Sequence, residues 1–366
     1  MADRQGAVEG MGMTRVWRDR SVFLTGHTGF KGAWLALWLA GLGARVSGYA
    51  LPPATTPSLF ALAGVRDALS GHHLADVRDA AALARAVREA EPEVVFHLAA
   101  QPLVRLSYRE PVETWGTNVM GTVNLLEAVR HCPSVKAVVV VTTDKCYENR
   151  EWLWGYRETD GLGGHDPYSA SKAAAELVAD SFRKAFFSAG VHGGGPLLAT
   201  ARAGNVIGGG DWSQDRLIPD AARAVAEGRS LRVRNPRATR PWQHVLESLR
   251  GYLLLAERLL AGDAGCADAF NFGPDPTGNV AVAEVLSRLA AQWQGLSWEV
   301  AAATDAPHEA GYLYLDSAKA RRMLNWEPVW SLDEALARTA SWYAAVAADP
   351  TVARRVTEEQ LECFRS

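Results

Sequence analysis

The sequence predicts an α/β protein: a Rossmann-type doubly wound parallel sheet with a smaller C-terminal domain. Three observations support this fold class. Short apolar runs alternate with longer helical patterns, a glycine-rich turn follows the first apolar run, and the composition changes after residue 204. The chain has 366 residues, of which 48% are hydrophobic. A chain of this size buries a large core and forms one large domain or two fused domains.

The expected strands are nearly continuous apolar runs, which is typical of parallel strands buried on both faces. They lie at residues 21–25, 45–49, 94–98, 137–142 and 197–203, and a further strand precedes residue 76. Apolar residues at helical spacing occupy the segments 32–42, 80–90, 113–130 and 167–188. Alternation at this length favours a doubly wound sheet over separate helical and strand layers.

The pattern divides the chain into three segments. Residues 1–19 are polar, contain Met11 and Met13 as alternative starts, and are expected to form a loose tail. Residues 20–204 carry the Rossmann pattern. Residues 205–350, rich in glycine, tryptophan, arginine and proline, are expected to form mainly a substrate domain, with some segments returning to the sheet. Such a domain would cover the carboxyl ends of the strands, where open α/β sheets bind ligands.

Composition argues against several classes of protein. The net charge is −3 and the chain has no basic block, so nucleic acid is not an expected partner. No apolar run approaches the roughly 20 residues that span a bilayer, and we expect no membrane association. The four cysteines form no Cys-x-x-Cys pair. We therefore expect free thiols, no metal site and a cytoplasmic location.

A glycine-rich loop joins the first expected strand to the first helix. Its residues are Gly26, His27, Thr28, Gly29, Phe30, Lys31 and Gly32. Glycines at this spacing allow a tight turn and close approach of a pyrophosphate, while the helix N-terminus offers free N–H groups to its oxygens. In this strand-turn-helix context the loop predicts a dinucleotide site.

The acid that usually grips the adenosine ribose is missing from the end of the second strand, which reads Gly48-Tyr49-Ala50-Leu51. No arginine follows directly that would favour a 2′-phosphate, so NAD is the expected cofactor. Asp76 lies just past the third expected strand and could reach the adenine. Equally, Asp76 could cap the helix that follows it.

Tyr168 and Lys172 form a Tyr-x-x-x-Lys pair, which places both side chains on one face of a helix. A lysine near a positively charged nicotinamide would lower the pKa of the phenol, so that tyrosinate takes a proton from a sugar hydroxyl. By itself the pair is common on solvated helices. The triplet Thr143-Asp144-Lys145 upstream supplies a hydroxyl, an acid and an amine to the same expected site.

With these motifs in place, the chain resembles the extended short-chain dehydrogenase/reductase family, and within it the nucleotide-sugar 4,6-dehydratases. The likeness covers residues 21–343. Besides the motifs above, its markers are His97-Leu98-Ala99-Ala100-Gln101, Asn118-x-x-Gly121-Thr122, Arg202-Ala203-Gly204-Asn205-Val206-Ile207-Gly208-Gly209-Gly210-Asp211-Trp212 and Arg240-Pro241-Trp242-Gln243-His244-Val245. Within this branch the chain most resembles the enzymes whose glucose is carried on cytidine diphosphate. Like them, it has a lysine, Lys145, directly after the aspartate, where most other 4,6-dehydratases have glutamate.

The resemblance implies a lyase that borrows NAD and returns it unchanged. Tyr168, assisted by Lys172 and Thr143, would take the 4-hydroxyl proton as hydride leaves C4. Loss of the C5 proton and the C6 hydroxyl, then return of hydride to C6, would give a 4-keto-6-deoxy sugar nucleotide for deoxysugar biosynthesis, such as that of O-antigen lipopolysaccharide. Asp144 would donate the proton to the departing hydroxyl. Lys145 would act at C5 as a base, or stay charged and stabilise the enolate.

The resemblance also implies the remaining ligand contacts. Leu98, Ala99, Ala100, Asn118 and Asp76 would contribute to the cofactor site. Gln101, Asn205, Arg216 and Arg240 would contribute to the substrate site, although Arg216 could equally form an ordinary surface ion pair. His97 is expected to pack rather than to exchange protons. A dimer, or a dimer of dimers, through the helices around 113–130 and 170–183 is expected on the same basis.

Three alternatives remain open. The first is a 4,6-dehydratase acting on dTDP-glucose or UDP-N-acetylglucosamine. The second is a nucleotide-sugar 4-epimerase, which shares Tyr-x-x-x-Lys and NAD but has no use for the Asp144-Lys145 pair. The third is a non-catalytic NAD sensor or scaffold, to which an intact set of catalytic residues is a poor fit.

Overall fold

The computed structural model describes residues 15–188, 195–301 and 311–365. Its centre is a seven-stranded parallel sheet with the order β11-β6-β5-β4-β1-β2-β3, which confirms the predicted fold class. The strands are β1 (Ser21–Thr25), β2 (Arg45–Ala50), β3 (Gly71–Leu74), β4 (Val94–His97), β5 (Ala137–Val141), β6 (Leu197–Ala203) and β11 (Ala269–Phe272).

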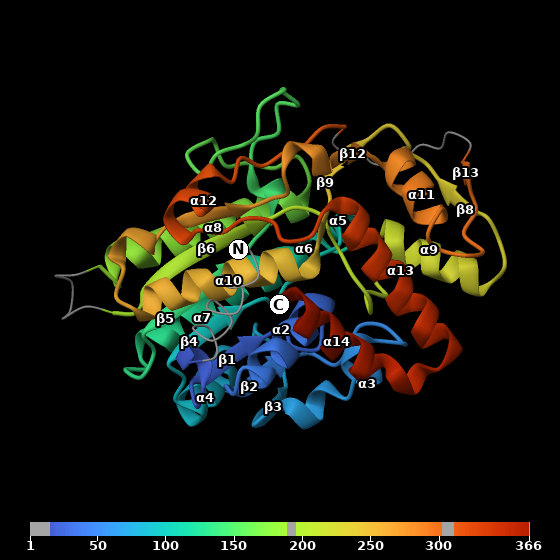
Figure 1. Cartoon of the computed structure of the whole chain (residues 1–366). Helices are drawn as coiled ribbons and strands as arrows, with labels where there is room; N and C mark the ends of the chain where they lie inside the picture. Colours follow the sequence, from blue (N-terminus) through green and yellow to red (C-terminus); the bar gives the residue numbers. More distant parts are fainter. Residues whose placement is uncertain (1–14, 189–194, 302–310, 366) are drawn as a thin grey trace, which may run out of the picture.

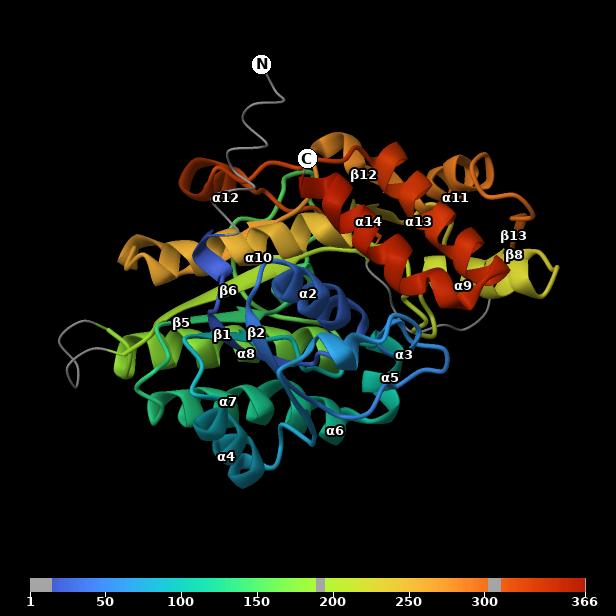
Figure 2. The same ribbon diagram turned by 60° about the horizontal axis from the view of Figure 1, so that its bottom comes forward.

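Helices cover both faces of this sheet, as Figure 2 shows. One face packs against α2 (Phe30–Gly41) and α10 (Val245–Leu260), and the other against α4 (Ala80–Ala90), α7 (Gly121–Arg130) and α8 (Pro167–Ala185). This double cover explains why the central strands are apolar throughout. In β5, for example, every residue is buried.

The helix expected at 113–130 is continuous but not uniform. It consists of α6 (Pro111–Trp115), a π-helical turn η2 (Gly116–Met120) and α7. Asn118 lies inside the π turn and is buried. Because π turns insert an extra residue and redirect side chains, they frequently occur beside functional sites.

Strand β11 is absent from the strands that the sequence pattern predicts. Its four residues, Ala269–Phe272, pair in parallel with β6 and extend the sheet at its edge. The strand is too short for its periodicity to stand out, and it follows the compositional change at residue 204. We propose that the boundary between the Rossmann domain and the C-terminal domain lies at 204/205. In this division α10 and β11 are segments that follow the boundary and return to the sheet.

Most of the other elements after β6 gather beyond the carboxyl ends of the strands, at the right of Figure 1. They include β8 (Leu231–Val233) with β13 (Trp298–Val300), and β9 (Thr239–Pro241) with β12 (Asn279–Ala281). The helices of this group are α9 (Leu217–Ala226), α11 (Val282–Ala290) and α13 (Leu332–Ala348), whereas α12 (Ala318–Leu324) contacts β11 and α10, and α14 (Ala353–Arg365) contacts α2. Short elements complete the chain: α3 (Leu59–Leu62), α5 (Val104–Arg109), β7 (Val206–Ile207), β10 (Gln243–His244) and several single turns, of which η3 (Asp144–Cys146) concerns the site.

Residues 1–14 of the expected N-terminal tail lie outside the described residues. In the described part, Trp17 is fully buried, and its indole Nε1 donates to Glu257 Oε1 at 2.7 Å. Residues around Trp17 therefore pack against α10. In the described ranges, no helix combines the length and the apolar character that crossing a membrane requires.

Candidate active site

The carboxyl ends of β1, β4 and β5 open onto a cavity of about 950 Å³. In the sheet, Thr25 of β1 pairs with His97 of β4, and His97 pairs with Val140 of β5. The strand order reverses between β1 and β4, and ligands of doubly wound sheets bind at this switch point. The loops that follow these strands carry the glycine-rich motif, Leu98–Ala100 and the triplet at 143–145.

The glycine-rich loop has a shape that only glycine allows at two positions. A Cβ on Gly26 (φ +78°) would lie 2.7 Å from the backbone nitrogen of Ala99, and one on Gly32 would lie 2.1 Å from the Gly26 oxygen. Helix α2 begins at Phe30 without a side-chain cap. Because its first turn lines the cavity, its free N–H groups suit a diphosphate. The loop therefore fits a dinucleotide.

Asp76 lines the cavity but is not a helix cap, so that alternative is wrong. The carboxylate of Asp79 caps α4 instead, accepting from Ala82 N at 2.9 Å. Asp76 binds Arg78, with Oδ2 2.5 Å from the guanidinium, and the hydrogen bonds to Arg78 lower the pKa of its carboxyl. A contact from Asp76 to the adenine stays a prediction.

Gln101 and Asn118 shape the loop that follows β4. The Asn118 amide accepts from Gln101 N at 2.8 Å and donates to Ser171 Oγ at 2.9 Å. The Gln101 amide accepts from Leu103 N at 2.5 Å and donates to Thr114 Oγ1 at 2.8 Å. Both side chains are buried, and neither lines the cavity. They hold Leu98, Ala99 and Ala100 in position beside it.

Two histidines near the site, His97 and His27, are held as neutral rings. His97 contacts the Thr25 and Thr122 hydroxyls at 2.7 and 3.2 Å, and burial lowers its pKa to about 3. His27 does not line the cavity. Its Nε2 is 2.8 Å from Nδ1 of His72, and burial lowers its pKa to about 4. Both rings therefore serve in packing, as expected for His97.

The triplet at 143–145 forms the start of η3, directly after β5. Thr143 caps this turn, accepting from Lys145 N at 3.3 Å, and donates to Asp144 Oδ1 at 2.9 Å. Lys145 Nζ lies 3.5 Å from the same oxygen. The second oxygen, Oδ2, is buried without a hydrogen-bond partner among the described residues. Asp144 is thus anchored through one oxygen, and the other is available to a ligand.

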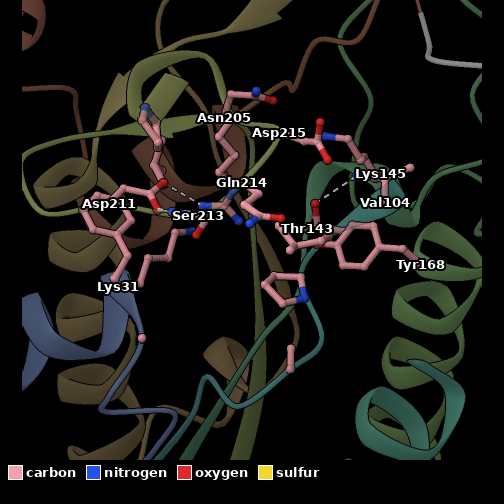
Figure 3. A pocket seen from close by; sticks show the side chains of 18 of the residues that line it. Lys31, Val104, Thr143, Lys145, Tyr168, Asn205, Asp211, Ser213, Gln214 and Asp215 are labelled. Carbon is pink, nitrogen blue, oxygen red and sulfur yellow. Dashed lines mark hydrogen bonds and ion pairs between the residues drawn. The ribbon is translucent and has the colours of Figure 1, made fainter. Parts of the chain in front are cut away.

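Tyr168 and Lys172 lie one turn apart on α8, whose N-terminus is capped by Asp166. Figure 3 shows the Tyr168 ring beside Thr143 and Lys145 at the cavity wall. Lys172 Nζ donates to the carbonyl of Val141 at 3.2 Å.

The expected lowering of the Tyr168 pKa does not occur in the ligand-free protein. Burial raises it to about 12, against an opposing hydrogen bond from Thr143. Burial, and after it the charge of Lys31, lowers the pKa of Lys172 to about 8. A lower pKa of this phenol would require additional positive charge in the cavity.

The cations of the opposite wall are held by residues that sequence reasoning missed. Arg216 Nη1 lies 3.0 Å from Oδ2 of the buried Asp211, and Lys31 Nζ donates to the Tyr252 phenol oxygen at 3.2 Å. Lys31 and Asp211 are visible together in Figure 3. Asp211 belongs to one of the family motifs, but spacing does not show that it would pair with Arg216. Tyr252 carries no sequence signal at all.

Asn205 and Arg240 also line the cavity, together with Arg216. Asn205 Oδ1 is buried without a hydrogen-bond partner among the described residues. Arg240 Nη1 donates to the Thr239 carbonyl at 2.8 Å. The structure thus brings together three of the four predicted substrate residues and leaves Gln101 in the adjoining loop.

Comparisons with known proteins agree with this geometry. Residues 23–339 match the family model described as GDP-mannose 4,6 dehydratase. A CDP-glucose 4,6-dehydratase of Salmonella typhimurium is 50% identical over 90% of this chain and 92% of its own length. A dTDP-glucose 4,6-dehydratase of Xanthomonas campestris is 28% identical over 73% and 77%.

Among solved structures, MoeE5 in complex with UDP-glucuronic acid and NAD superposes with a TM-score of 0.72 at 25% identity. The match covers 89% of this chain and 99% of that one.

Proposed function

This chain belongs to the GDP-mannose 4,6-dehydratase family, and we propose from that membership that it is a hydro-lyase acting with NAD on CDP-D-glucose. The product is CDP-4-dehydro-6-deoxy-D-glucose. One geometric observation carries the reaction type: the buried Asp144, with one carboxylate oxygen left for a ligand, adjoins Tyr168 in the cavity at the switch point. A tyrosine base for the C4 hydroxyl beside an acid for the departing C6 hydroxyl suits oxidation of a sugar followed by loss of water.

Bound NAD supplies the chemistry of hydride acceptance from C4 and its return to C6. The residues that hold it are Gly26, His27, Thr28, Gly29, Phe30, Lys31, Gly32, Asp76, Leu98, Ala99, Ala100, Asn118, Tyr168 and Lys172. Among them, His27 and Asn118 act through the loops that they support. Phe30 and Lys31, in the first turn of α2, offer their N–H groups to the diphosphate.

Tyr168 takes the proton of the sugar 4-hydroxyl. Thr143 orients the phenol, and the Lys172 ammonium favours its ionised form once a cofactor charge is added. Asp144 then gives a proton to the hydroxyl that leaves C6, through its unpartnered Oδ2.

Lys145 acts at C5, where a proton must leave. Its ammonium is half-exposed and close to Asp144, which suits two roles. As an amine it removes the C5 proton. As a cation it stabilises the enolate oxygen.

The diphosphate of the substrate is held by Asn205, Arg216 and Arg240, since guanidinium groups suit phosphate oxygens. Gln101 contributes by positioning the loop at 98–100. Cytidine is favoured over thymidine because the CDP-glucose relative is 50% identical and the dTDP-glucose relative only 28%.

The test uses CDP-glucose carrying deuterium at C4. Intramolecular hydride return predicts a product lighter by one water, with deuterium at C6 and no net reduction of NAD. An epimerase would give a product of unchanged mass, and a sensor would give none. A dTDP-glucose or UDP-N-acetylglucosamine panel, run beside it, identifies a different nucleotide preference.

We also propose a homodimer, or a dimer of such dimers, in the cytoplasm, without nucleic-acid or membrane partners. The helices at the expected interface expose apolar side chains: Val112 is 84% exposed, Met120 51% and Leu177 59%. Surfaces of this kind commonly mark association. Sedimentation of wild type and of Leu177→Glu tests this: the variant is expected to sediment as a smaller species, and an unchanged sedimentation coefficient would contradict the interface.

A further inference from the structure

Lys31 brings a positive charge into the glycine-rich loop, where the proposed reaction assigns no task to its side chain. The residue lies in the first turn of α2 and lines the cavity. Its ammonium donates to the Tyr252 phenol oxygen at 3.2 Å and lies 5.6 Å from the centroid of the Tyr252 ring. Helix α10, which carries Tyr252, packs against α2. The side chain is therefore held in one place by a neighbouring helix.

The charges that face Lys31 come from three further elements. Arg216, before α9, and Lys172, on α8, repel its ammonium, while Asp144 of η3 attracts it. From α10, Tyr252 offers a neutral acceptor. Burial, and after it the repulsion from Arg216, lowers the pKa of Lys31 to about 7. Lys31 thus gains and loses a proton near neutral pH, among charged groups that line the same cavity.

Oxidised and reduced NAD differ by one positive charge, which the nicotinamide ring carries when oxidised. A nearby ammonium disfavours the oxidised form relative to the reduced one. By linkage, the reduced form raises the affinity of Lys31 for its proton by the same factor. The two equilibria are therefore coupled through electrostatics alone, without a change in shape.

We propose that Lys31 sets the relative affinity of this protein for oxidised and reduced NAD through its charge. This inference rests on the proposed binding of NAD. It adds a residue whose charge regulates which redox form of the cofactor that site prefers. Protonated Lys31 holds the reduced cofactor in the interval before hydride returns to the sugar. Neutral Lys31 favours the oxidised form, in which the cycle begins and ends.

The test measures dissociation constants of NAD⁺ and NADH, without sugar, between pH 8 and pH 6 at constant ionic strength. The cofactor-free wild type is compared with Lys31→Met and Lys31→Arg. In wild type, the ratio Kd(NAD⁺)/Kd(NADH) is expected to rise about tenfold as pH falls, which is the effect of one like-charge pair within roughly 10 Å at an effective dielectric constant of about 20. Lys31→Met loses this rise, and Lys31→Arg stays at the high ratio because its guanidinium keeps its proton.

Tyr252→Phe is the matched variant, because it removes the acceptor and keeps the ring. It should shift the midpoint of the rise to lower pH, since the ammonium loses a hydrogen bond. Burial, and after it the charge of Lys31, lowers the pKa of Lys172 to about 8, so Lys31→Met raises this pKa. Any rise of the ratio that Lys172 causes in Lys31→Met is therefore expected at higher pH than the rise assigned to Lys31. Melting curves verify that each variant folds. If Lys31→Met does not fold, the ratios measured with Lys31→Arg and Tyr252→Phe test the inference instead.

A wild-type ratio that is constant with pH would overturn the inference, as would a rise in Lys31→Met of the same size and midpoint as in wild type. An unchanged midpoint in Tyr252→Phe would also count against it. Failure of wild type to bind either form of NAD would contradict the proposed function instead, so the two failures are distinguishable.

Discussion

Glu176 and Arg202 form an ion pair that is almost completely buried, with Arg202 Nη2 2.8 Å from Glu176 Oε2. Glu176 lies one turn after Lys172 on α8, and Arg202 lies in β6. Arg202 Nη1 donates to the phenol of Tyr147 at 2.7 Å, directly after the turn that carries Asp144. The pair therefore ties the helix of the proposed base to the turn of the proposed acid.

Removing both partners of this pair should cost less than the two single removals added together. Glu176→Gln leaves a buried guanidinium without its counter-charge, and we expect the free energy of unfolding to fall by roughly 3–5 kcal/mol. Glu176→Met combined with Arg202→Met should lose less than the sum of the single variants. Denaturant unfolding at pH 7 measures both. Strictly additive losses would mean that the two charges do not interact.

Glu257 should make the protein less stable as pH rises. Burial raises the pKa of its carboxyl to about 7, whereas in the unfolded chain it is about 4.3. Between these values the unfolded chain ionises first, so stability falls as pH rises from about 4.3 and levels off above about 7. Glu257→Gln should be close to wild type near pH 4.5 and exceed it by about 3–4 kcal/mol at pH 8.

The control for this measurement is Glu358→Gln, at an exposed pair with Arg354 on α14. It should change stability by less than about 1 kcal/mol at both pH values. The raised pKa of Glu247 affects all three proteins equally and cancels in the differences. If Glu257→Gln were destabilising at pH 8, the Glu257 carboxylate would stabilise the fold there, and its pKa in the folded protein could not be raised.

Tyr168→Phe should lower kcat by about 100- to 10,000-fold, the range that one positioned acid or base contributes. Cofactor affinity should change little, because the ring and Lys172 stay in place. Steady-state kinetics and NADH binding measure the two quantities separately. Tyr108→Phe, which alters an exposed phenol on α5 outside the cavity, is the control. Full activity in Tyr168→Phe would rule out the proposed proton transfer.

Arg216→Met should raise KM by about 10- to 100-fold with a smaller change in kcat, because it removes charge-assisted contacts to the diphosphate. Arg216→Lys should recover part of the loss, since it restores the charge without the bidentate geometry. Arg229→Met, at an exposed pair with Glu227, is the control. If KM stayed constant while unfolding became easier, Arg216 would serve only its ion pair with Asp211.

Local motifs made much of this site predictable. Tyr168 and Lys172 face the same way because one helix carries both, and the glycine-rich loop follows a strand that its own apolar residues specify. Gln101 shows the limit of such reasoning. A polar side chain after a strand is equally consistent with the cavity and with its own loop, and only the Leu103 and Thr114 contacts decide for the loop.

Contacts between residues far apart in the sequence could not be predicted, for a different physical reason. Lys31 and Tyr252 are 221 residues apart, and their contact depends on how α10 crosses α2. Asp211 and Arg216 are close in sequence, yet their pairing depends on how the loop between them turns. The same applies to β11, whose place beside β6 follows from packing of α10 rather than from any pattern within its own residues.

Lys145→Glu should separate the step at C5 from the step at C4. The substitution places at position 145 the residue that most 4,6-dehydratases carry, and it reverses a charge 3.5 Å from Asp144. We expect solvent deuterium uptake at C5 to change more than the rate of C4 oxidation, which depends on Tyr168. Mass spectrometry of product formed in D₂O, together with single-turnover absorbance of the reduced cofactor, measures the two steps. Equal uptake and an equal overall rate in the variant and wild type would make Lys145 a bystander.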